Sequence, residues 1–107
     1  NAQYADLVKE LDRKGVDISA NPLLGFYKGA SCQNLNRINE AINAYSEVIK
    51  HGDNLFVEEA EWYRSLCYLK TGDKTKAKNE LLAVIERKGH FEKDAKAVLR
   101  RIKYTLK

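Results

Sequence analysis

The spacing of apolar residues along the chain predicts a series of amphipathic helices. In residues 3–14, apolar side chains recur at the i, i+3, i+4, i+7 spacing that places them on one helical face. These residues are Tyr4, Leu7, Val8 and Leu11. The same period returns in the segments near 22–35, 38–51, 56–71, 74–88 and 91–105. No segment shows the alternation of a strand, so the pattern predicts an all-α protein of six helices joined by short connectors.

Capping and breaking residues mark the ends of these helices. Asn21 is expected to cap the helix that follows it, and Pro22 is well tolerated in a first turn. Asp73 should cap a later helix in the same way, and Asp53 or Asn54 should cap the one between them. Helices are expected to end near the glycines at Gly15, Gly52, Gly72 and Gly89.

Two parts of the chain align on each other at a constant offset. Residues 26–29 (Phe-Tyr-Lys-Gly) match residues 62–65 (Trp-Tyr-Arg-Ser), an offset of 65 − 29 = 36. Ala41 matches Ala77 at the same offset, and the Val-Ile pair at 48–49 matches that at 84–85. A repeat near this length with two helical patterns inside it indicates stacked helical hairpins.

The repeated units resemble the tetratricopeptide repeat, whose helix pair carries large and small residues in a fixed order. In the second unit that order is filled by Trp62, Ser65, Tyr68, Gly72, Ala77 and Leu81. In the first unit it is filled by Phe26, Gly29, Cys32, Asn36, Ala41 and Tyr45. The period of 36 exceeds the usual ~34. Cys32 stands where the family has an aromatic, and Asn36 where it has a turn glycine.

The resemblance implies an all-α, right-handed superhelix of helical hairpins in a single domain over residues 1–107. Its expected parts are an N-terminal helix (3–14), two repeats (22–52 and 56–89) and a C-terminal capping helix (91–105). The N-terminal helix is either a cap or the second half of a truncated repeat. Residues 62–73 are similar to bacterial tetratricopeptide proteins that often carry a membrane anchor, which implies a cell-envelope or a cytoplasmic location.

In this family the first helix of each pair lines a concave groove, so the resemblance implies a scaffold that binds a partner protein. The internal register places an aromatic strip on that side, together with Gln33 and Glu59. The strip consists of Leu23, Phe26, Tyr27, Ala30, Trp62, Tyr63, Leu66 and Leu69. Trp and Tyr are enriched at binding hot spots. The alternative is that the strip buries itself against the terminal helices, because aromatics also dominate cores.

One binding mode of the family is not expected here. Its chaperone-binding members clamp a partner's terminal carboxylate with Lys and Asn side chains. The matching positions hold Phe26, Ala30 and Tyr63, which cannot donate a charge-assisted hydrogen bond to a carboxylate. We therefore expect no capture of acidic C-terminal tails by that clamp.

The net charge of +4 and the pI of about 9.1 raise a second possibility, contact with nucleic acid or an anionic membrane surface. Cations gather at Lys74, Lys76 and Lys78 and on the last helix. Acids are interspersed and no nucleic-acid-binding motif accompanies them, so a solvated outer face is the favoured interpretation. The first alternative to partner binding is self-assembly, with an open terminal face stacked on a second copy.

The sequence contains no motif that indicates catalysis or cofactor binding. His51 and His90 lack Cys or His neighbours at metal-ligand spacing, and no Gly-rich phosphate loop or nucleophile–base set is present. We expect no enzyme activity, no metal and no cofactor. Cys32 and Cys67 lie in helical patterns and are predicted to be buried thiols, or a disulfide if their helices bring them within reach. The chain opens without methionine, so we expect it to be part of a longer protein.

Overall fold

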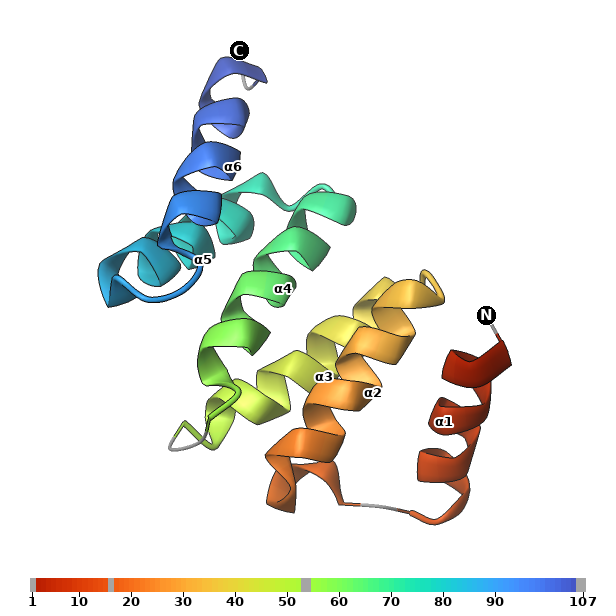
Figure 1. Cartoon of the computed structure of the whole chain (residues 1–107). Coiled ribbons are helices and arrows are strands. Elements are labelled where there is room, and N and C mark those ends of the chain that lie inside the picture. The colour runs from red at the N-terminus through yellow and green to blue at the C-terminus, as the bar shows by residue number, and fades with distance from the viewer. Residues whose placement is uncertain (1, 16, 53–54, 106–107) are drawn as a thin grey trace.

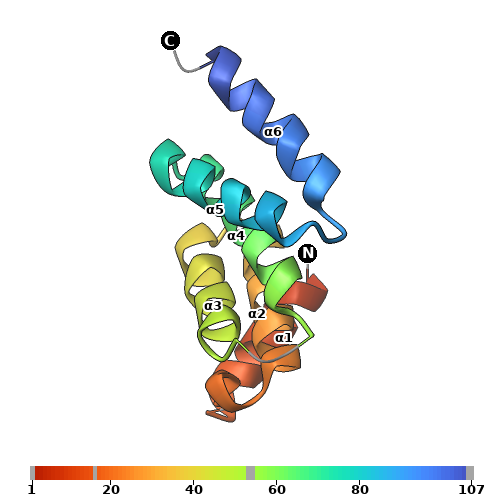
Figure 2. The same ribbon diagram turned by 90° about the vertical axis from the view of Figure 1, so that its left-hand side faces the viewer.

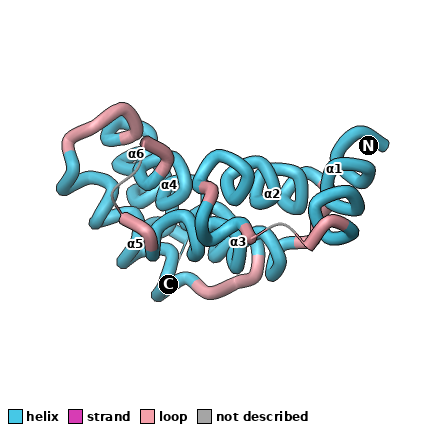
Figure 3. The backbone as a smooth tube through the Cα atoms, turned by 90° about the horizontal axis from the view of Figure 1, so that it is seen from below, coloured by secondary structure: helices cyan, strands magenta, loops and turns pink. Residues whose placement is uncertain are grey.

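The computed structural model describes residues 2–15, 17–52 and 55–105. These residues form six α-helices and a short 3₁₀-helix, and they include no strand (Figure 3). The elements are α1 (Ala2–Arg13), η1 (Ile18–Ala20), α2 (Pro22–Asn34), α3 (Ile38–Lys50), α4 (Val57–Lys70), α5 (Lys74–Arg87) and α6 (Glu92–Thr105). The predicted all-α class and six helices are confirmed, and η1 lies in the connector expected after the first helix.

Each helix packs against the helix before it and the helix after it. Helices α2 and α4 run in the same direction, with α3 returning between them (Figure 1). At the C-terminal end α6 packs on α5 and extends along one end of the molecule (Figure 2). The resulting body measures 44 × 28 × 18 Å, and its elongated shape follows from this sequential packing.

Two of the predicted helix caps are made by the expected side chains. Asn21 Oδ1 accepts a hydrogen bond from the Leu24 N–H at 3.2 Å, with Pro22 in the first turn of α2. Asp73 Oδ1 accepts one from the Lys76 N–H at 3.1 Å and begins α5. Helix α4 begins after Phe56 without a side-chain cap; Asp53 and Asn54, the predicted caps, lie outside the described residues.

The turn after α2 and the turn after α4 have the same construction. Asn36 has φ 60° and Gly72 has φ 85°, so the residue that replaces the turn glycine adopts the left-handed conformation of a glycine. In both turns the following N–H returns to the helix: Arg37 N–H donates to Cys32 O at 2.8 Å, and Asp73 N–H to Tyr68 O at 2.9 Å. The 36-residue offset is thus reproduced in the backbone.

The end of α5 differs from the prediction. Lys88, with φ 53°, takes the left-handed capping position that was expected of Gly89. The Glu58 carboxylate lies against the Cα of Gly89, in the space that a side chain at that position would occupy. Glycine at position 89 therefore leaves room for the Glu58 side chain of α4. The cap of α5 lies at Lys88, one residue before the predicted Gly89.

Replacing Gly72 by alanine should lower the free energy of unfolding by about 1 kcal/mol, because a Cβ disfavours the left-handed region. No atom lies within 4 Å of the Cβ position, so a steric clash would not contribute. Gly52→Ala is the control, since Gly52 is not in that region and should change stability by less than about 0.5 kcal/mol. Urea unfolding followed by circular dichroism measures both. Equal effects of the two substitutions would contradict the assignment.

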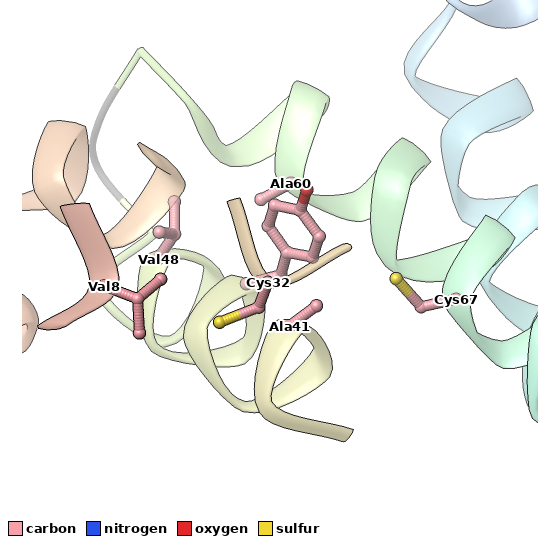
Figure 4. Packing of buried hydrophobic residues seen from close by; sticks show 7 residues of the cluster. Val8, Cys32, Ala41, Val48, Ala60 and Cys67 are labelled. Carbon is pink, nitrogen blue, oxygen red and sulfur yellow. The ribbon is translucent and has the colours of Figure 1, made fainter. Parts of the chain in front are cut away.

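Buried side chains form two hydrophobic clusters. The first joins α1, α2, α3 and α4 (Figure 4). It contains Val8, Cys32, Ala41, Tyr45, Val48, Ala60 and Cys67. The second joins α5 and α6 through Leu81, Val84, Ala95 and Ile102. Trp62 and Leu69 of α4 pack against the second cluster, so α4 contributes to both and links the two halves of the molecule.

The small residues of the repeat pattern on α2 and α4, Gly29 and Ser65, are both buried. A Cβ on Gly29 would lie 2.5 Å from Cε1 of Tyr45, so the tyrosine ring occupies the space that glycine leaves empty. The 36-residue offset places Ser65 and Leu81 at the positions that correspond to Gly29 and Tyr45, and both are fully buried. The second unit therefore has a larger residue at the small position and a smaller residue at the large position.

Both cysteines are free thiols with no exposed surface. Cys32 comes from α2 and Cys67 from α4, within the same cluster (Figure 4). Burial raises the pKa of the Cys67 thiol to about 11 and also raises the pKa of Cys32. The predicted buried thiols are confirmed, and the disulfide alternative is not realised.

A candidate peptide groove between α2 and α4

Helices α2 and α4 present matched faces to a groove between them. On α2 that face carries Phe26, Ala30, Gln33 and Asn34, at i, i+4, i+7 and i+8. On α4 it carries Tyr63, Leu66 and Lys70, at i, i+3 and i+7. These residues line two adjoining cavities, which share Gln33 and Asn34. We call the two cavities together the α2–α4 groove.

The aromatic end of the groove is a cavity of about 330 Å³. Phe26 and Tyr63 lie with ring centroids 5.9 Å apart, and Tyr63 stacks on Tyr45 at 6.2 Å. The Phe26 ring also stacks on the Phe56 ring, with ring centroids 5.7 Å apart. Because each ring is held by others, this apolar surface exists before any partner binds, and ordering it on binding costs little.

Tyr45 of α3 lies against the lining of the aromatic cavity, in the space left by Gly29, and its side chain has no exposed surface. Its hydroxyl donates a hydrogen bond to Oε1 of Gln33 at 2.8 Å. Burial raises the pKa of Tyr45, so the hydroxyl stays protonated and remains a donor at physiological pH. Because this bond uses the Gln33 amide oxygen, it orients the amide group. The amide nitrogen is then the hydrogen-bond donor that Gln33 can offer to a partner.

The polar end of the groove is a cavity of about 440 Å³. Its lining comprises Gln33, Asn34, Asn36, Ile38, Leu66, Cys67 and Lys70. The Asn34 amide nitrogen donates to the carbonyl of Ala30 at 2.8 Å, which leaves its side-chain oxygen as an acceptor. Lys70 is exposed and has no ion-pair partner among the described residues.

The predicted aromatic strip divides into three parts. Phe26, Ala30, Tyr63 and Leu66 line the groove. Leu23 and Tyr27 do not line it, but they are 40% and 48% exposed.

The remaining two residues of the strip take part in packing. Trp62 stacks on Phe91, with ring centroids 5.5 Å apart and planes 11° from parallel, and Leu69 packs against the same second cluster. Both alternatives from the sequence, an open strip and a self-buried one, therefore apply to different residues.

Several groove residues were not predicted. Tyr45 was placed in the repeat pattern but not on the strip, and its ring occupies the space that Gly29 leaves on the facing helix. Asn34 and Lys70 extend the helical spacing of Phe26 and Tyr63 by about two turns, which a longer projection of the two faces would have found. Gln33 was placed on this side and does line the groove.

The basic residues are partly engaged within the molecule. Lys96 contacts Glu92 at 2.8 Å and Lys76 contacts Asp73 at 3.9 Å. The Lys76 ammonium also lies 5.7 Å from the centre of the Tyr68 ring. Charge is thus interspersed along α5 and α6, as expected of a solvated face.

Metal-binding clusters and membrane-spanning helices are absent from the described residues. No three His, Cys, Asp or Glu side chains in that part of the chain gather closely enough to hold a metal ion. His51 Nε2 lies 3.9 Å from Glu47 Oε2. The rings of His90 and Phe91 form a T-shaped contact, with centroids 4.9 Å apart. Of the helices described, none combines the length and apolar character needed to cross a bilayer.

Comparison of the chain with protein-family models, with curated proteins and with solved structures finds no match.

Proposed function

We propose that this protein is a scaffold that binds a segment of a partner protein in the α2–α4 groove and carries out no catalysis itself. The observation that supports this most directly is the aromatic end of the groove. Phe26 and Tyr63 are half-buried yet line an open cavity of about 330 Å³, and neighbouring rings hold them in place. Preorganised aromatic surfaces of this kind favour binding because little entropy is lost on association.

We further propose that the fold is a right-handed superhelix of two degenerate tetratricopeptide-like units between terminal helices. The repeated left-handed turns at Asn36 and Gly72, 72 − 36 = 36 residues apart, support equivalence of the two units. The parallel course of α2 and α4, with α3 between them, is the arrangement in which first helices share one concave side (Figure 1).

The test introduces a bulky charge into the groove. Ala30 is half-buried in α2, and Ala30→Arg should fill the aromatic cavity and weaken binding of a library-selected peptide about tenfold or more, or about 1.4 kcal/mol. The probe is a peptide selected from a random library against the whole chain and measured by fluorescence anisotropy. Ala83→Arg is the control, because Ala83 is also half-buried in a helix but does not line the groove.

Circular dichroism establishes that both variants are folded. Equal affinity of the selected peptide for the wild type, Ala30→Arg and Ala83→Arg would contradict the proposed site. So would nuclear magnetic resonance shifts that map the peptide to α5 and α6 instead of α2 and α4.

Self-association is the second candidate function, favoured by exposed leucines outside the groove. Leu82 of α5 is 48% exposed and Leu55, which precedes α4, is 89% exposed. Light scattering over a range of concentrations separates the candidates. A dimer that is lost in Leu82→Lys supports self-association, whereas a monomer at all concentrations contradicts it.

A further inference from the structure

The two ends of the α2–α4 groove differ in chemistry, and this difference restricts the partner. One end is aromatic, formed by Phe26, Tyr45 and Tyr63. The other end carries amides and the ammonium group of Lys70. None of the described residues that line either cavity is acidic, so the groove has a positive end without an internal counter-charge.

Lys70 is suited to contact a partner's anion. It lies in the last turn of α4, is exposed, and pairs with no carboxylate among the described residues. Many other cations of the chain do have such a partner, for example Lys28, whose ammonium contacts Asp12 at 3.0 Å. An unpaired lysine at the polar end of the groove favours an acidic ligand through charge complementarity.

The middle of the groove offers an amide donor and an amide acceptor. Tyr45 donates to the Gln33 amide oxygen and the Asn34 amide nitrogen donates to Ala30, while the Gln33 amide nitrogen and the Asn34 amide oxygen have no hydrogen-bond partner among the described residues. A peptide unit of an extended chain presents one C=O and one N–H. The pair of amides therefore matches the backbone of a segment that lies along the groove.

The helix geometry sets the spacing between the two ends. Tyr63 and Lys70 are two turns apart on α4, a rise of about 10 Å at ~1.5 Å per residue. An extended peptide covers about 3.3 Å per residue, so about three residues bridge this distance.

From these features we infer that the groove binds an extended peptide in which a large apolar side chain is followed, about three residues away, by an acidic side chain. The apolar side chain occupies the cavity of Phe26 and Tyr63, and the carboxylate contacts Lys70. This inference rests on the proposed function and names its class of partner. It uses a side-chain acid and requires no terminal carboxylate.

Three short peptides, each acetylated and amidated so that no terminal charge remains, provide the test. The probe is acetyl-Phe-Ser-Gly-Asp-amide. One comparison peptide replaces its aspartate by lysine, and the other replaces its phenylalanine by alanine. Titrations are followed by two-dimensional nuclear magnetic resonance of the labelled chain. The probe should shift resonances of α2 and α4, including the side-chain amide of Gln33, and should bind at least about fivefold more tightly than either comparison peptide.

Charge reversal gives the decisive result. Lys70→Glu should invert the preference, so that the lysine peptide binds at least about fivefold more tightly than the aspartate peptide. Lys9→Glu is the matched control, an exposed lysine on α1 with no ion-pair partner among the described residues, and it should leave the preference unchanged. Added salt should weaken binding of the aspartate peptide more than binding of the lysine peptide.

The outcomes separate this inference from the function on which it rests. If both charged peptides bind α2 and α4 equally and Lys70→Glu changes neither, the acidic class of partner is wrong and the groove function stands. If the three peptides fail to bind while the library-selected peptide still maps to the groove, the inference is likewise wrong. If the library-selected peptide also maps elsewhere, the proposed function fails with it.

Discussion

Replacing Gly29 by serine should destabilise the protein by about 2–3 kcal/mol, because the new side chain meets the Tyr45 ring. A Cβ at this position lies 2.5 Å from Cε1 and 2.6 Å from Cδ1 of Tyr45. Moving the Tyr45 ring aside would cost free energy, because the ring is fully buried and its hydroxyl is hydrogen-bonded to Gln33. Ala30→Ser, one residue further on α2 and half-buried, should cost less than about 1 kcal/mol and serves as the control.

The second repeat shows how the loss should be reversed. At the 36-residue offset Ser65 and Leu81 correspond to Gly29 and Tyr45, so Gly29→Ser combined with Tyr45→Leu installs in the first repeat the residue pair of the second. Tyr45→Leu alone should cost about 2–4 kcal/mol through lost contacts and a cavity. The double variant should be at least about 1 kcal/mol more stable than the sum of the single effects predicts. Strict additivity in urea unfolding would contradict the size-matching account.

The features that the sequence predicted are local ones. Helix periodicity and the caps at Asn21 and Asp73 depend on residues within one or two turns, and the structure has both. The sequence showed only that Asn36 replaces a turn glycine. Its left-handed conformation is found in the structure, and asparagine tolerates that conformation better than most residues. The ends fixed by packing were less predictable. Lys88 rather than Gly89 caps α5, where Glu58 of α4 contacts the glycine.

The candidate site depends on contacts between helices, and here prediction from the sequence was incomplete. The register placed Trp62 beside Tyr63 on one strip and left open whether that strip is exposed or buried; Trp62 stacks on Phe91, a residue 29 positions later in the chain (91 − 62 = 29). No local sequence pattern predicts where α6, which begins directly after Phe91, lies relative to α4. Tyr45 likewise lies against the aromatic cavity only because Gly29 lies opposite it on another helix. The aromatic identity of the groove was predictable, whereas its exact members were not.

The largest electrostatic effect on stability is expected at Arg64, which links three helices. From α4, its guanidinium forms a bidentate ion pair with Glu80 of α5, with Nη2 2.9 Å from Oε2, and donates to Ser46 Oγ of α3 at 3.0 Å. The side chains of Arg64 and Glu80 are only 18% and 9% exposed. Water has little access to this site, so it cannot fully replace a lost partner. Each charged group is therefore stabilised mainly by the other.

Glu80→Ala should therefore lower the free energy of unfolding by about 2–4 kcal/mol, since it leaves the Arg64 charge in a partly buried site without its carboxylate. Glu40→Ala is the matched control. It removes a bidentate partner from Arg37, but those two side chains are 49% and 41% exposed. Its cost should stay below about 1 kcal/mol and fall further with salt.

The double variant Arg64→Met with Glu80→Leu distinguishes charge burial from a simple loss of packing. If the unpaired charge causes the damage, replacing both partners by apolar side chains should cost at least about 1 kcal/mol less than Glu80→Ala alone. A double variant as unstable as the single one would show instead that hydrogen bonding to Ser46 or the packing around Tyr68 is dominant. The Arg64 guanidinium carbon lies 5.6 Å from the centre of that ring, so Arg64→Lys, which loses the fork and weakens the stacking, should fall between the wild type and Glu80→Ala.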